Sequence, residues 1–197
     1  MKAEFYLNKT KLLEQYNILK EKGDIISYSL KTNFEVGKIL EKETNCWTSV
    51  HFLQSLEKLE DKSRALFFAQ ALTQEDLKTL FSLGVNKYVV DNKEDLKKLV
   101  EYVTKNNKQM ILFLRMRMKE HTIHTGKHFV FGMLAKEVNQ AIAELKNNSN
   151  ITLGIHFHRK TQNIHEWSMH YELKDSLTEE TLSTIKYLNM GGGIPVS

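Results

Sequence analysis

The chain has 197 residues, of which 41% are hydrophobic and 26% are charged, a composition typical of a globular domain with one sizeable core. Its formal net charge at pH 7 is only +4, and lysines alternate with acidic residues along the predicted helices, so no surface for nucleic acid is indicated. No apolar run approaches the ~20 residues that cross a bilayer, and the polar N-terminus does not resemble a secretory signal. We therefore expect a cytoplasmic protein that binds neither nucleic acid nor membrane.

The single cysteine, Cys46, excludes an internal disulfide framework and a cysteine-based zinc site. Only one proline occurs, and no linker rich in glycine, serine or proline interrupts the chain. We therefore predict a single domain over residues 1–197.

Amphipathic segments and short apolar segments alternate along the chain. A helix is predicted first, over 9–23, and further helices over 73–84, 91–103, 135–147 and 177–185. Thr73 is a predicted N-cap and Gly84 a predicted helix stop. Seven strands are predicted, over 25–31, 46–50, 65–69, 87–91, 111–116, 151–157 and 185–191.

This alternation indicates an α/β fold with a parallel sheet and right-handed crossovers. About seven βα units without a visible break favour a (β/α)₈ TIM-barrel type, incomplete, over a doubly wound sheet. In such a barrel the chemistry lies on the loops that follow the strands. The residues that end each apolar run are therefore the candidates for function.

Polar residues follow most of the predicted strands, and four of these features together indicate a phosphate-bearing cofactor. A lysine in a partly apolar pocket can act as an amine nucleophile, and glycines let backbone N–H groups approach a phosphate closely. Each feature alone has an ordinary explanation, such as a lysine that reaches solvent, an arginine paired with Asp91, or a simple turn. The four features are Lys31, Arg115, His158 and Gly191–Gly193.

Several segments resemble signatures of the pyridoxal-phosphate-dependent fold-type III amino-acid decarboxylases, which have an alanine racemase-like barrel. SYSLKTN (27–33) resembles their Tyr-Ala-x-Lys-Ala-Asn signature, and LNMGGGIP (188–195) resembles their glycine turn. LGIHFHRKTQ (153–162) resembles their histidine segment. LFLRM (112–116) and FVFGM (129–133) match two further stretches, and the order and approximate spacing agree along the whole chain. The family includes ornithine, lysine, arginine, diaminopimelate and carboxynorspermidine decarboxylases.

The resemblance implies a role for each candidate residue. Lys31 would hold the aldehyde of pyridoxal 5'-phosphate as a Schiff base, and His158 would stack on the pyridine ring. Arg115 would lie near the cofactor, while Thr161, Gly191, Gly192 and Gly193 would hold its phosphate. The implied reaction is decarboxylation of a basic or diamino amino acid, as in polyamine or lysine biosynthesis, with Lys31 and His158 as catalytic residues and no metal.

The sequence also departs from the family pattern. Trp47 stands where the family has an acid, Val130 where it has a lysine, and Asn189 where it has an aspartate; Arg159 and Lys160 follow the histidine. The family continues with an eighth strand and a C-terminal β-domain that complete a dimeric site. We therefore expect a barrel truncated before its eighth strand, completed by a homodimer partner or a complementary chain.

Two other interpretations stay open. The first is a metal-dependent barrel hydrolase, because His156 and His158 form a His-x-His pair, and His165, Glu166 and His170 follow closely. The second is a non-catalytic decarboxylase homologue with a regulatory or assembly role, which the departures at Trp47 and Val130 favour.

Overall fold

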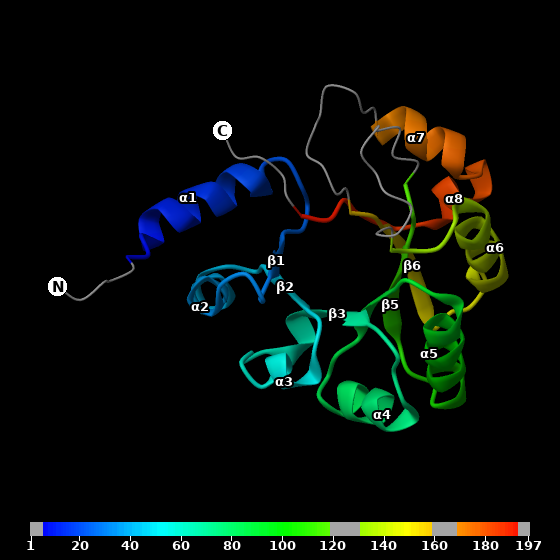
Figure 1. Ribbon diagram of the computed structural model, residues 1–197, viewed down its shortest axis with the longest axis horizontal. Coiled ribbons are helices and arrows are strands. Elements are labelled where there is room, and N and C mark those ends of the chain that lie inside the picture. The colour runs from blue at the N-terminus through cyan, green and yellow to red at the C-terminus, as the bar shows by residue number, and fades with distance from the viewer. Residues whose placement is uncertain (1–5, 119–130, 159–168, 193–197) are drawn as a thin grey trace.

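The computed structural model describes residues 6–118, 131–158 and 169–192. It contains one parallel sheet of seven strands in the order β1-β2-β3-β4-β5-β6-β7, curled upon itself, with helices along its outer side (Figure 1). The strands are β1 (Ser27–Ser29), β2 (Trp47–Val50), β3 (Ala65–Ala69), β4 (Lys87–Val90), β5 (Met110–Arg115), β6 (Ile151–His156) and β7 (Tyr187–Asn189).

The helices alternate with these strands. They are α1 (Lys9–Lys20), α2 (Phe34–Glu43), α3 (Leu53–Leu56), α4 (Gln74–Ser82), α5 (Lys93–Lys105), α6 (Ala135–Leu145), α7 (Met169–Ser176) and α8 (Glu179–Thr184), with a 3₁₀ turn at Lys62–Arg64. Thr73 caps α4 through a capping box, and Gly84 follows that helix with a φ of 83°, as predicted. The incomplete barrel of α/β type is confirmed.

The first strand is shorter than predicted, and an unpredicted helix follows it. The backbone N–H of Thr32 donates to Ser29 O at 3.0 Å, which closes a turn directly after β1. The side chain of Asn33 then accepts from the N–H groups of Glu35 and Val36 and begins α2. Lys31 therefore lies in an exposed turn between a strand and a helix, and the prediction of a strand over 25–31 was wrong at its carboxyl end.

The seventh strand and a short helix also differ from the prediction. The strand predicted over 185–191 is limited to Tyr187–Asn189, because Ile185 still caps α8. The short helix α3 lies in a segment for which no helix was predicted. Its four residues carry too little periodicity for a sequence pattern to detect.

Buried side chains on the two faces of the sheet form separate clusters. The larger core lies between the sheet and the helices and includes Phe67, Leu77, Tyr88 and Leu99. On the concave face, Leu66, Val89 and Phe113 form a smaller cluster, because successive residues of a strand point to opposite faces.

Rings from opposite ends of the sheet show how strongly it curls. Four strands lie between β2, which carries Trp47, and β7, which carries Tyr187, yet the two ring centroids are 6.1 Å apart. Tyr187 also contacts Phe113 at 5.8 Å. The concave face is therefore the packed interior of an incomplete barrel, with its loops gathered at the carboxyl ends of the strands.

Candidate active site at the carboxyl ends of the strands

Two cations and a histidine lie at the carboxyl ends of the strands, which form the mouth of the barrel. Lys31 lies in the turn after β1, His51 immediately follows β2, and Arg115 is the last residue of β5. Burial, the charge of Lys31 and the charge of Arg115 together hold the pKa of His51 below its usual range. Leu30 N–H donates to Ser49 O at 3.1 Å, which places the turn of Lys31 beside the end of β2. Arg115 lines a small cavity together with Phe68, whose ring packs on that of His51.

Arg115 is fixed by residues 131–133. Met133 N–H donates to Arg115 O at 2.8 Å, and the guanidinium lies 5.2 Å from the centre of the Phe131 ring. Gly132 has a φ of 107°, and a Cβ there would lie 2.8 Å from Arg115 O, so only glycine fits. Burial lowers the pKa of Arg115, and Asp91 opposes that effect. This arrangement holds a positive charge partly inside the barrel mouth.

His156 lies in the same row of the sheet as Arg115 and Asn189. Its side chain is 3% exposed, and burial, followed by the charges of Arg115 and His158, lowers its pKa to about 3. A side-chain hydrogen bond with Asn189 opposes this shift. His156 is therefore a neutral side chain of the interior at physiological pH.

The glycine turn after β7 is tied to the end of β6. Gly192 N–H donates to His158 Nδ1 at 3.2 Å, and Gly191 N–H donates to Asn189 Oδ1 at 2.9 Å. Gly191 has a φ of 74°, and a Cβ there would lie 2.6 Å from Phe157 O and 2.7 Å from His158 Nδ1. Asn189, where the family has an aspartate, uses its amide oxygen to hold this turn.

Some predicted residues cannot be placed. Thr161 and Gly193, together with the departures Val130, Arg159 and Lys160, lie outside the described residues. Trp47 can be placed: it begins β2, at the opposite end of that strand from His51, where Lys87 Nζ lies 5.0 Å from its ring. The substitution at Trp47 therefore fills the barrel interior, packed between β2 and β7.

The sequence prediction missed His51. A sequence pattern could have identified it, because Trp47, Ser49 and His51 are alternate residues and therefore lie on one face of β2 and its extension. Phe68 was missed as well, and it connects two histidines of the mouth: its ring lies 4.6 Å from that of His51 and 5.2 Å from that of His156.

The part of the chain that the structure describes contains no group of three or more His, Cys, Asp or Glu placed to hold a metal ion. His165 and Glu166, which the hydrolase interpretation requires, lie outside that part. No helix among the described residues has both the length and the apolar character needed to span a membrane.

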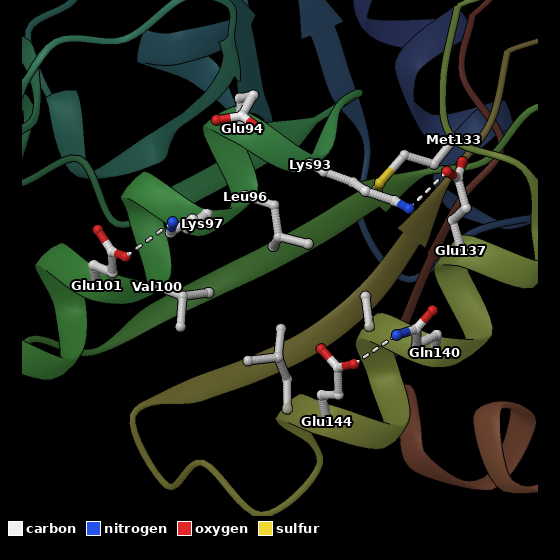
Figure 2. A pocket seen from close by; sticks show the side chains of 12 residues that line it. Lys93, Glu94, Leu96, Lys97, Val100, Glu101, Met133, Glu137, Gln140 and Glu144 are labelled. Atoms are coloured by element: carbon white, nitrogen blue, oxygen red, sulfur yellow. Dashed lines mark hydrogen bonds and ion pairs between the residues drawn. The ribbon is translucent and has the colours of Figure 1, made fainter.

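A groove of about 400 Å³ lies away from the mouth, on the outer surface between α5 and α6 (Figure 2). The ion pair between Lys93 and Glu137, 2.8 Å long, bridges the two helices at one end of the groove. Leu96, Val100 and Leu145 line its apolar part. None of the predicted site residues that the structure describes lines the groove, so it is not the candidate site.

The residues of the mouth suit an anionic cofactor with an aldehyde. An amine, a guanidinium, an exposed imidazole and a glycine turn all lie at the carboxyl ends of the strands, and the space around Gly191 would be filled by any side chain. The fold and these residues define an incomplete parallel α/β barrel whose carboxyl end suits a phosphate-bearing cofactor.

A family model identifies the family, within this class of barrels, to which the chain belongs. Residues 52–197 match the pyridoxal-dependent decarboxylase family at its pyridoxal binding domain, so the chain belongs to that family and its cofactor is pyridoxal phosphate. The match begins after Lys31, whose assignment rests on the SYSLKTN signature and on its position at the barrel mouth.

Several solved structures have a similar fold. AQ1208 from Aquifex aeolicus has a TM-score of 0.71 at 20% identity, over 96% of this chain and 48% of its own. The arginine decarboxylase of Paramecium bursaria Chlorella virus, bound to agmatine, has a TM-score of 0.68 at 22% identity, over 94% of this chain and 52% of its own. The lysine/ornithine decarboxylase of Vibrio vulnificus, complexed with putrescine, has a TM-score of 0.64 at 20% identity, over 97% of this chain and 53% of its own.

The chain spans about half the length of these solved structures. A search of curated proteins found no match.

Proposed function

We propose that this chain is the cofactor-binding part of a decarboxylase that acts on a basic or diamino amino acid. The observation that carries the proposal is that Lys31, Arg115 and the turn from Gly191 to Gly192 lie at the carboxyl ends of β1, β5 and β7, which share one end of the parallel sheet. The substrate class is supported by the similar structures, whose ligands include agmatine and putrescine.

Each described residue has a task that its chemistry allows. Lys31 presents a primary amine in an exposed turn, where it can bond covalently to an aldehyde and, once released, transfer a proton. Arg115 holds a positive charge that orients an anionic group, and the N–H groups of the glycine turn can approach phosphate oxygens. The ring of His158 is exposed beside that turn and can stack on a flat ring. Bound pyridoxal phosphate supplies the electron sink for loss of CO₂.

We further propose that a homodimer partner or a complementary chain completes the site. Among the described strands, β1 and β7 each pair on one side only. An unpaired strand edge is a place where another strand can add.

The cofactor assignment is tested by adding pyridoxal phosphate to the purified protein and recording its visible absorbance. We expect the band of a lysine-bound pyridoxal in the wild type and none in Lys31→Ala. Lys38→Ala is the matched control, because Lys38 is an exposed lysine that pairs on the surface of α2 with Glu35 at 2.8 Å. A band that persists in Lys31→Ala, or that is absent from the wild type, would contradict the assignment.

Activity is tested by CO₂ release from ornithine, lysine, arginine, diaminopimelate and carboxynorspermidine, with any complementary chain present. We expect release from at least one of these substrates and none in Lys31→Ala. Cofactor binding without release from any of them would favour the non-catalytic interpretation instead.

A further inference from the structure

His51 is a half-buried residue of the mouth to which no step of the proposed function assigns a role. Its ring meets that of Phe68 edge to face, with centroids 4.6 Å apart and an interplanar angle of 65°. Phe68 in turn packs against the buried His156 at 5.2 Å and 86°. Because Phe68 is held by its contact with His156, it restricts the orientation of the His51 ring.

The two ring nitrogens of His51 have different surroundings. Nδ1 is buried and has no hydrogen-bond partner among the described residues. A proton on Nδ1 would therefore be a buried donor without an acceptor, which costs about 1–3 kcal/mol. The neutral ring avoids that cost by carrying its proton on Nε2. The donor that His51 can offer to a ligand is therefore Nε2–H.

The charges around His51 explain which ligand group this donor suits. Lys31 from the turn after β1 and Arg115 from β5 both act on the ring electrostatically. The third neighbour, His156 behind Phe68, is neutral, and Asp91 acts on Arg115. A donor beside two cations is suited to an anionic oxygen placed between them.

We propose that His51 is a further binding residue of the cofactor site, whose Nε2–H donates to an anionic oxygen of pyridoxal phosphate held between Lys31 and Arg115. This inference rests on the proposed function, since it takes pyridoxal phosphate to bind at this mouth. The oxygen belongs either to the phosphate or to the ring, and both share the same acceptor chemistry.

Two amide substitutions separate a donor at Nε2 from one at Nδ1. Gln places its amide nitrogen near the position of Nε2, whereas Asn places it near Nδ1. We expect His51→Gln to keep the dissociation constant for pyridoxal phosphate within about threefold of the wild type, and His51→Asn and His51→Phe to raise it about tenfold or more. Urea unfolding of each variant shows whether it is folded.

Comparison ligands identify the oxygen. If the phosphate is the acceptor, pyridoxal without phosphate binds His51→Gln and His51→Asn equally, while inorganic phosphate competes less well in His51→Asn. If a ring oxygen is the acceptor, pyridoxal itself distinguishes the two variants. Equal affinity of wild type, Gln, Asn and Phe variants for pyridoxal phosphate would overturn the inference while leaving the proposed function intact.

A measurement on the cofactor-free protein tests independently whether Lys31 lies close to His51. The pKa of His51, followed by NMR of its imidazole protons, should rise in Lys31→Met because one neighbouring positive charge is removed. Lys38→Met should leave it unchanged. An unchanged pKa of His51 in Lys31→Met would overturn the inference regardless of the cofactor-binding results. A wild type that does not bind pyridoxal phosphate would overturn both the inference and the proposed function.

Discussion

Gly191 connects the conformation of one residue to the whole turn after β7. Its backbone lies in the left-handed region, and a Cβ would approach Phe157 O and His158 Nδ1 within 2.7 Å. Both atoms belong to the two residues that follow β6, so a side chain at Gly191 must push the turn away from His158. The hydrogen bond from Gly192 to His158 depends on that close approach.

We therefore predict that Gly191→Ala destabilises the protein by about 1–3 kcal/mol and weakens pyridoxal phosphate binding. Urea unfolding and absorbance titration measure the two effects. Gly192→Ala is the matched control, because a Cβ at Gly192 meets nothing within 4 Å and its φ is not positive. We expect it to change stability by less than about 0.5 kcal/mol; an equal loss in both variants would contradict this explanation.

His156 makes stability depend on pH in a direction that its burial determines. Folded His156 stays neutral down to about pH 3, whereas the unfolded side chain takes up a proton near its ordinary pKa of 6.5. Between these values the unfolded state binds more protons, so acid favours unfolding. This contribution is complete above pH 6.5 and is lost as the pH falls toward 3.

We predict that the free energy of unfolding falls by about 1 kcal/mol per pH unit below pH 6.5 on account of His156. The measurement is urea unfolding at several pH values between 7 and 4.5, for wild type and His156→Gln. The variant should show a shallower slope. Identical slopes would mean that His156 does not stay neutral in the folded protein.

Among the helices, α5 has a second task besides covering the sheet. Asp95 in its first turn is buried, and its carboxylate accepts hydrogen bonds from Ala71 N–H at 2.9 Å and Leu72 N–H at 3.0 Å. These bonds hold the loop after β3, in which Ala71 has a φ of 53°. Gln70 in the same loop lines a small cavity together with Arg115. The start of α5 thus positions one wall of the mouth.

Asp95→Ala is predicted to cost about 2–3 kcal/mol, because it leaves the buried N–H of Leu72 and the part-buried N–H of Ala71 without their acceptor. Urea unfolding measures this loss. Glu94→Ala is its control: Glu94 lies in the same first turn but is exposed, so we expect a change below about 0.5 kcal/mol. A loss in Asp95→Ala no larger than in Glu94→Ala would refute the role of Asp95.

The elements differ in how far the sequence alone predicts them. Helices α4, α5 and α6 combine a periodic apolar face with start signals, and their predicted ranges lie within a few residues of the observed ones. The end of β1 was predicted wrongly because Lys31 and its neighbours satisfy a strand pattern as well as a turn. The side chain of Asn33 caps α2 and thereby favours the turn over the strand. Apolar periodicity does not detect such a local hydrogen bond.

The candidate site was predictable where one strand end carries a distinctive residue type. Lys31, Arg115, His158 and the glycines could be selected by chemistry and strand position. The role of Phe131 and Gly132 in fixing Arg115 depends on contacts between β5 and the segment before α6, which no local pattern contains. The proximity of His51 to both cations likewise follows from how the sheet curls.

That curl is a property of the entire sheet and is set by the residues that fill its concave face. Gly154 allows it at the centre, since a Cβ there would lie 2.9 Å from both the Phe113 ring and Tyr187 Cβ. The large rings of Trp47 and Tyr187 then meet across the interior. Without this contact, β2 and β7 would diverge, and the glycine turn after β7 would lie farther from Lys31.

A double-mutant cycle measures whether the two ends of the sheet meet in this way. Trp47→Ala and Tyr187→Ala should each destabilise the protein, and the double variant should lose less than the sum, with a coupling of about 0.5–1.5 kcal/mol from the ring contact. Trp47 paired with Tyr102 is the control, because Tyr102 stacks on Phe81 among the helices and shares no ring contact with Trp47. That pair should be additive within about 0.5 kcal/mol. If Trp47 and Tyr187 were additive too, the sheet would be more open in solution, and Lys31 and the glycine turn could not act on one cofactor without a further element that draws β7 toward β1.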